Sequence, residues 1–340
     1  MPKKKKQHYV PQCYLNAWAI PDTHQVYVFD KMLQTTRRNS IEDIASEKYF
    51  YDIDFTGIVS EEDLKNFGLD DCNPANLDDG QYIENFFATK VEGNYRDILN
   101  KIISRTRQMN LWEMKNCFFI SEYNKFLFSF HLAYQIIRVK AVRNSLMDSQ
   151  DCLVQALKDM RASQETIARY GISESHLPFI HGKMILDRKE IDDISKCFFT
   201  LSWILLVNRT GYPFFTSDSP IGTIAHIQHP ICSMTGLASR GVEVYFPISP
   251  DLMLIMADGE YHKLDHCDRR ILAADNIDEI RYYNSKCIIN SERCVFSSCE
   301  DFSIVDEMIK ENPKILHQPH SMMQWGGKTY TPQRNKEFEV

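Results

Sequence analysis

The chain has 340 residues, of which 44% are hydrophobic and 12% aromatic, and it carries a formal net charge of -7 at pH 7. That length suits one large domain or two of ordinary size, with enough apolar material for a packed core. The negative charge argues against wholesale wrapping by nucleic acid, although it is compatible with a local basic groove. No apolar run approaches the roughly 18 residues that a membrane span needs, so we expect no membrane partner.

The ten cysteines are scattered, and several stand in apolar runs such as Lys196–Phe199, with no C-x-x-C pair. This pattern is typical of reduced, buried thiols, so we expect a cytoplasmic protein without a cysteine zinc site. Lys3 to Lys6 are followed by no hydrophobic run. We therefore expect no secretory signal, and we favour a solvated tail over a nucleic-acid-binding arm.

The first half of the chain is predicted to be mainly helical. The segment 81–105 repeats apolar residues on one helical face, and 117–146 is apolar nearly all round, which indicates a helix buried in the middle of a domain. The other elements predicted here are a short helix at Pro11, a strand at 26–29, a polar turn at 35–39, a loop at 56–80, and helices at 150–170 and 190–199.

The second half changes character and is predicted to be rich in strands. These strands lie at 202–207, 214–216, 242–247, 252–256 and 294–296, and one helix lies at 271–284. Helices first and strands later indicate an α+β fold, with a helical N-terminal half packed on a mainly antiparallel sheet from the C-terminal half. We expect one domain over 1–320, helix-rich over 1–199 and strand-rich over 200–300, followed by a loose tail over 321–340.

Familiar catalytic motifs are absent: the sequence has no P-loop, G-x-G-x-x-G, G-x-S-x-G or H-E-x-x-H pattern. The candidates are instead polar residues at positions where the pattern calls for apolar ones. At 100° per residue, His131, Gln135 and Arg138 fall within about 60° of one another on the buried helix. This strip is either an internal ion pair that locks two helices together, or the lining of a pocket in which Arg138 holds a phosphate or carboxylate.

Three further features admit two interpretations each. Glu84 and Glu92 lie on or near the apolar face of the preceding helix. Glu84 then either forms a salt bridge with Arg138 or has a pKa raised by burial and acts as a general base. His8 is either a surface residue or a catalytic one, and Asp218 in Thr216–Pro220 either makes an Asx turn or supplies a ligand group.

Several segments, in this order, resemble the family catalogued as domain of unknown function 4238. Ser219 departs from the family pattern, which usually has Asn after the Asp, and this weakens any role for an amide there. The resemblance implies a bacterial anti-phage module and carries no settled reaction. The matching segments are His8–Gln12, Phe50-Tyr51, Ile83-Glu84, Val91–Gly93, Arg138 with Arg143, Phe214–Pro220 and Phe246–Pro250.

The leading hypothesis is an anti-phage effector that hydrolyses nucleic acid or a nucleotide, and the alternative is a non-catalytic sensor or interaction protein that recognises a phage component. Glu92 and Asp218 are the candidate ligands of a hard divalent ion such as Mg²⁺ or Mn²⁺. Convergence of His8, Glu92, Arg138 and Asp218 around an open cavity would favour catalysis, whereas Arg138 sealed in a dry core would favour the sensor. The predicted catalytic residues are His8, Glu84, Glu92 and Asp218, and the predicted substrate-binding residues are Tyr9, Gln12, His131, Gln135, Arg138, Arg143 and Ser217.

Overall fold

A computed structural model describes residues 4–53, 80–171, 176–229, 233–316 and 322–332. Its centre is a five-stranded sheet in the order β10-β5-β9-β8-β7, antiparallel except that β10 runs parallel to β5. The strands are β5 (Ser202–Asn208), β7 (Gly222–Ala225), β8 (Val242–Ser249), β9 (Leu252–Ala257) and β10 (Arg270–Ala274).

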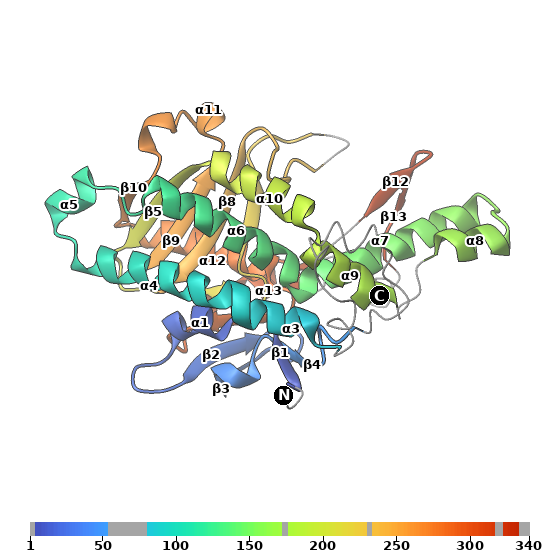
Figure 1. The fold of residues 1–340 in the computed structure, drawn as a ribbon, viewed down its shortest axis with the longest axis horizontal. Coiled ribbons are helices and arrows are strands. Elements are labelled where there is room, and N and C mark those ends of the chain that lie inside the picture. Colours follow the sequence, from blue (N-terminus) through green and yellow to red (C-terminus); the bar gives the residue numbers. More distant parts are fainter. Residues whose placement is uncertain (1–3, 54–79, 172–175, 230–232, 317–321, 333–340) are drawn as a thin grey trace.

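This sheet is covered on both faces, which explains why its strands are apolar without interruption. Trp203 and Leu205 of β5 belong to one hydrophobic core, and Ile204 and Leu206 belong to another, as the two-residue period of a strand requires. In Figure 1 α4 (Glu92–Gln108), α6 (Glu122–Arg138) and α10 (Arg188–Thr200) cover the front face, and α12 (Ile277–Asn290) and α13 (Ser303–Glu311) lie behind.

A second, antiparallel sheet has the order β3-β2-β11-β6 and pairs strands from the first 40 residues with strands from the second half of the chain. Its strands are β2 (Gln25–Asp30), β3 (Thr35–Ser40), β11 (Cys294–Ser297) and β6 (Thr216–Ser217). The α+β class is therefore confirmed, but strands also form in the N-terminal half. The turn predicted at 35–39 is wrong, because β3 is an all-polar edge strand and gives no apolar alternation to detect.

The long buried helix predicted at 117–146 is divided at Val139, where α6 ends and α7 (Lys140–Asp159) begins. Two side chains from other segments cap the C-terminal end of α6. Nε2 of His181 lies 2.8 Å from the Ile137 carbonyl oxygen, and the Tyr51 hydroxyl donates to the Arg138 carbonyl oxygen at 2.8 Å. Sequence periodicity does not reveal such tertiary caps.

Three other predictions need correction. The helix at 81–105 consists of α3 (Tyr82–Phe86), a π-helical turn at Phe87–Val91, and α4. The helix predicted at 271–284 starts later, because 270–274 form β10 and Asn276 caps α12. In the tail that was expected to be loose, β12 (Met323–Trp325) and β13 (Lys328–Tyr330) form a hairpin beside α7.

The remaining elements complete the fold. Helix α7, helix α8 (Gln164–Tyr170) and the β12–β13 hairpin project to the right in Figure 1, away from the central sheet. No helix within the described ranges is long and apolar enough to cross a membrane. The loop predicted at 56–80 lies almost entirely outside those ranges. The other elements are β1 (Lys6–His8), α1 (Gln12–Leu15), β4 (Ser46–Lys48), α5 (Leu111–Asn116), α8 (Gln164–Tyr170), α9 (Leu177–Leu186), α11 (Gly259–His262), and 3₁₀ turns at Asn16–Trp18, Ile41–Asp43, Asp265–Cys267 and Pro313–Leu316.

Candidate functional site

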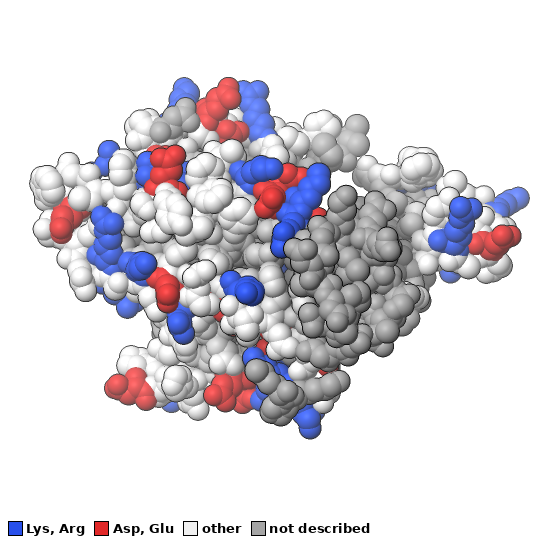
Figure 2. Space-filling view, in the orientation of Figure 1, with Lys and Arg blue, Asp and Glu red and all other residues white. Residues whose placement is uncertain are grey.

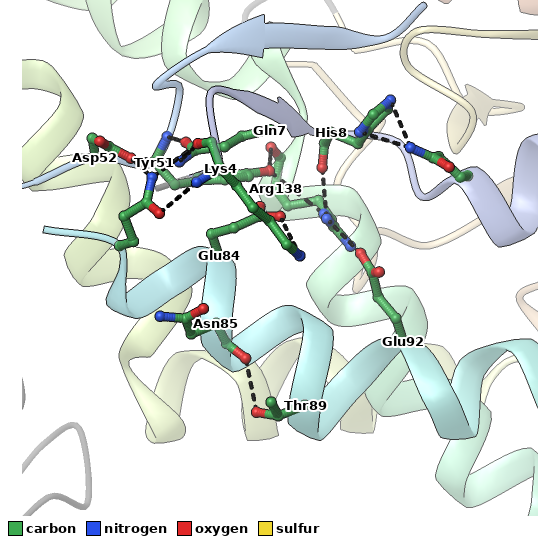
Figure 3. Close-up of polar contacts among 12 residues, drawn as sticks. Lys4, Gln7, His8, Tyr51, Asp52, Glu84, Asn85, Thr89, Glu92 and Arg138 are labelled. Carbon is green, nitrogen blue, oxygen red and sulfur yellow. Dashed lines mark hydrogen bonds and ion pairs between the residues drawn. The ribbon is translucent and has the colours of Figure 1, made fainter. Parts of the chain in front are cut away.

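Arg138 is the hub of a polar centre between α4, α6 and the first strand (Figure 3). Its side chain is 2% exposed, and Nη2 donates to the His8 carbonyl oxygen at 2.6 Å and to Oε1 of Glu92 at 3.0 Å. Its guanidinium also lies 3.9 Å from the centroid of the Phe87 ring. A buried guanidinium needs an anion such as the Glu92 carboxylate to offset its lost hydration. We call His8, Tyr51, Glu92 and Arg138 the Arg138 centre.

The π-helical turn brings Phe87 and Glu92 to the same guanidinium. At 100° per residue these two positions would lie about 140° apart on an uninterrupted α-helix. A π turn instead bonds residue i to i+5, and here the Glu92 N–H donates to the Phe87 carbonyl oxygen. The ring and the carboxylate can therefore contact Arg138 together. No residue pattern in the sequence announces this turn.

Glu84 does not form the predicted salt bridge with Arg138. Its carboxylate instead lies 3.3 Å from Nζ of Lys4, and burial raises the pKa of Glu84, as the general-base interpretation requires. The His8 ring lies 3.3 to 3.4 Å from Nε2 of Gln12. Burial lowers the pKa of His8, although the nearby carboxylate of Glu92 opposes that shift.

The rest of the predicted polar strip holds chain segments together. Nε2 of Gln135 reaches the Tyr9 carbonyl oxygen at 3.5 Å, and His131 packs against the Tyr95 ring with its pKa lowered by burial to about 4. Nη2 of Arg143 donates to the Phe50 carbonyl oxygen at 2.8 Å and lies 3.2 Å from Nδ1 of His181. These contacts are not ion pairs; the ion pair that joins two helices is the one between Arg138 of α6 and Glu92 of α4.

Asp218 lies elsewhere, at the end of β6, and is 3% exposed. Oδ1 accepts the Glu292 N–H at 2.8 Å, and Oδ2 accepts the N–H groups of Arg293 and Cys294 at 2.8 Å each. Burial nevertheless raises the pKa of Asp218 to about 6. The predicted Asx turn is therefore absent, because the carboxylate binds a distant loop. Ser217 donates its hydroxyl to the Ser219 carbonyl oxygen at 2.9 Å and faces no open space.

A cleft of about 1020 Å³ opens between β3, β4, the start of α7 and the end of α12. Of the predicted site residues, Tyr9 and Asp218 line it, whereas His8, Glu84, Glu92 and Arg138 do not. The four groups named for catalysis therefore do not meet around one cavity. Most charged residues of the lining escaped sequence reasoning: Lys31, Arg37, Asp43, Glu47, Lys140, Lys286, Glu292 and Arg293.

Some charged side chains of the cleft already form ion pairs or hydrogen bonds within the protein, and others do not. Nζ of Lys140 pairs with Glu47 at 3.1 Å, and Nζ of Lys31 donates to three backbone carbonyls at the end of α12 and in the 3₁₀ turn that follows α13. Nζ of Lys286 lies over the Tyr282 ring and has no carboxylate partner among the described residues. The Tyr9 hydroxyl likewise makes no hydrogen bond to a described residue. The cleft thus presents spare donors to a polar ligand.

The described residues contain no group of three or more His, Cys, Asp or Glu side chains that could hold a metal ion. The two candidate metal ligands also have different partners: Glu92 pairs with Arg138, and Asp218 accepts backbone N–H groups. The geometry of the described residues thus gives no support to the predicted Mg²⁺ or Mn²⁺ site at Glu92 and Asp218.

Comparison with known proteins adds one relationship. No curated protein and no solved structure matches the chain. A family described as "Protein of unknown function (DUF4238)" matches residues 6–301, which include both the Arg138 centre and the residues of the cleft up to Phe296. The chain therefore belongs to the DUF4238 family.

Proposed function

We propose that this protein binds a nucleotide or the end of a nucleic acid in the cleft, and that it serves as a sensor in bacterial anti-phage defence in the cytoplasm. The observation that carries the proposal is the meeting of Tyr9 and Asp218 at one polar cleft. They come from two of the segments that resemble the family, the His-Tyr-x-Pro-Gln and Phe-x-Thr-Ser-Asp-x-Pro elements. The defence setting rests on that resemblance alone.

The size and chemistry of the cleft suit such a ligand. A volume of about 1020 Å³ is at the upper end of small-molecule sites, which is room for a nucleotide. Cationic side chains can meet phosphate, while the Tyr9 hydroxyl and the amide oxygens of Asn144 and Asn290, whose amide nitrogens already donate to Glu292, Ser219 and Ile221, can meet a base or sugar. In Figure 2 basic and acidic side chains are interspersed over the helical face, and no large patch of one charge forms there. We therefore place the binding of an anionic ligand in the cleft and not on that face.

Binding is favoured over hydrolysis because the Arg138 centre is closed. Arg138 is buried against Glu92 and the His8 carbonyl oxygen, and these groups do not line the cleft. Hydrolysis of the same ligand is the second candidate, supported by a different observation. Burial raises the pKa of Asp218 to about 6, so this carboxyl can exchange a proton near neutral pH beside Tyr9.

One set of titrations separates the two candidates. Purified protein is titrated with ATP, AMP, a short RNA and a short DNA by calorimetry, and each mixture is analysed by chromatography with and without Mg²⁺ or Mn²⁺. Saturable binding with intact ligand supports the sensor, and product formation supports the hydrolase. If none of these ligands binds or is cleaved, the proposed function is wrong. A plaque assay with Tyr9→Phe then tests whether cleft binding matters to defence.

A further inference from the structure

We propose that Arg37 and Arg293 together form a phosphate-binding site in the cleft, an assignment that rests on the proposed function. Both residues line the cleft. The strand register places them around Asp30, the last residue of β2. Asp30 is opposite Thr35 of β3 on one side and Cys294 of β11 on the other, so Arg37 approaches it from β3 and Arg293 from the residue before β11.

The two guanidinium groups share one carboxylate oxygen. Oδ2 of Asp30 lies 3.2 Å from Nη1 of Arg37 and 2.9 Å from Nη2 of Arg293. Nε of Arg293 is 3.0 Å from each carboxylate oxygen, and Nε of Arg37 donates to Asn39 at 2.9 Å. Both forks are thus held in place before any ligand arrives, which lowers the entropy cost of binding one.

The arrangement leaves positive charge unmatched. The Asp30 side chain is 0% exposed and carries one negative charge for two guanidinium groups, whose side chains are 39% and 52% exposed. Of the other acids that line the cleft, Glu47 pairs with Lys140 and Asp43 with Lys6, whereas Glu292 accepts a hydrogen bond from the neutral Asn144 and Asp218 accepts backbone N–H groups. Within the pair with Asp30, two guanidinium groups thus share one carboxylate, and both line the cleft.

Unused donors accompany that charge. Among the described residues, neither Nη2 of Arg37 nor Nη1 of Arg293 has a hydrogen-bond acceptor. Two guanidinium forks with free N–H groups match the several oxygens of a phosphate better than a lone lysine does. Asp218 is a positioning residue for this site, because its carboxylate holds the backbone N–H of Arg293.

The test compares two arginines of the same strand. Arg37→Gln removes a proposed phosphate donor, and Arg38→Gln removes the same charge from the opposite side of β3, where Arg38 lies over the Tyr27 ring and outside the cleft lining. The probes are AMP against adenosine, and a 5′-phosphorylated oligonucleotide against its 5′-hydroxyl form. We expect Arg37→Gln to weaken binding of the phosphorylated probes about tenfold or more, and Arg38→Gln to leave it unchanged.

The outcomes separate this site from the proposed function. A phosphorylated probe that binds wild type and Arg37→Gln equally, yet binds Tyr9→Phe more weakly, overturns the phosphate site and leaves the cleft in use. Failure of all probes to bind wild type overturns both. If AMP responds and the oligonucleotide does not, the source of the phosphate is a free nucleotide. If Arg37→Gln has a lowered melting temperature, Arg37→Lys replaces it, because lysine keeps the positive charge beside Asp30 but lacks the guanidinium fork. Weaker binding of the phosphorylated probes by Arg37→Lys, at the melting temperature of wild type, would support the phosphate site.

Discussion

Tyr51 and Arg138 engage each other through both backbone and side chain. The Tyr51 hydroxyl donates to the Arg138 carbonyl oxygen at 2.8 Å, and the same hydroxyl accepts from Nε of Arg138 at 3.5 Å. One residue thus ends α6 and helps to satisfy a buried guanidinium. The end of the helix and the ion pair with Glu92 are therefore expected to fail together when either is disturbed.

Removal of the anion from the Arg138 centre should cost more than removal of a similar carboxylate nearby. Glu92→Gln leaves the buried guanidinium without a counter-charge and should lower the free energy of unfolding by about 1–3 kcal/mol. Glu84→Gln is the matched control, because its partner Lys4 is 55% exposed and that pair is worth little. Urea unfolding of both variants measures the difference. Equal losses would contradict the ion-pair account.

Asp218→Asn should destabilise the protein, although its sequence position alone suggests a harmless change. One oxygen that accepts backbone N–H groups becomes an amide that donates, so up to two donors lose their acceptor. The expected loss is on the order of 2–3 kcal/mol, and thermal melting checks it. Asp193→Asn on α10 is the control, because that carboxylate is half-exposed. An Asp218→Asn protein that melts like wild type would show that the loop does not depend on this carboxylate.

Acidification should weaken the contribution of His181 to stability. Burial, reinforced by Arg143, lowers the pKa of His181 to about 4, below the ordinary value of 6.5. Its contribution is therefore complete above about pH 6.5 and is lost as pH falls towards 4. The difference in unfolding free energy between wild type and His181→Asn should shrink between pH 7 and pH 4.5. A difference that is constant with pH would mean that His181 does not titrate this way.

Two tyrosine hydroxyls should separate ligand binding from stability. Tyr9 lines the cleft and its hydroxyl makes no hydrogen bond to a described residue, so Tyr9→Phe should keep the melting temperature and weaken binding of the proposed ligand about three- to tenfold. The Tyr51 hydroxyl caps α6, so Tyr51→Phe should lower the melting temperature and leave affinity unchanged. Calorimetric titration and thermal melting of both variants provide the comparison. The reverse pattern would reject the assignment of Tyr9 to the ligand.

The parts of the fold that depend on local residue pattern could be predicted from the sequence. The α+β class, the buried helix that carries Arg138 and the strands at 202–207, 242–247 and 252–256 all follow from apolar periodicity, and the structure contains them. The residue pattern also marks Glu92 and Arg138 as anomalous, and the two do form an ion pair. The extent of the single domain over 1–320 stays a prediction.

The rest depends on contacts that no local pattern encodes. Arg37 stands on a strand whose exposed polar residues resemble a turn, and Arg293 follows a helix as an ordinary surface charge would. Their common site exists only because β2 pairs with β11. In the same way, the caps on α6 come from Tyr51 and His181, far from α6 in the chain.

The strand pairing between β2 and β11 also sets an order of events during synthesis. Asp30 and Arg293 are 263 residues apart, so β2 has no native partner on that side until β11 has been synthesised. Pairing of such distant segments is slow, because a long loop must close before the contacts form. The helical segments can form earlier, whereas the sheet that carries Asp30 must wait. The cleft, which Cys294 and Phe296 of β11 help to line, is therefore completed only after β11 has paired with β2.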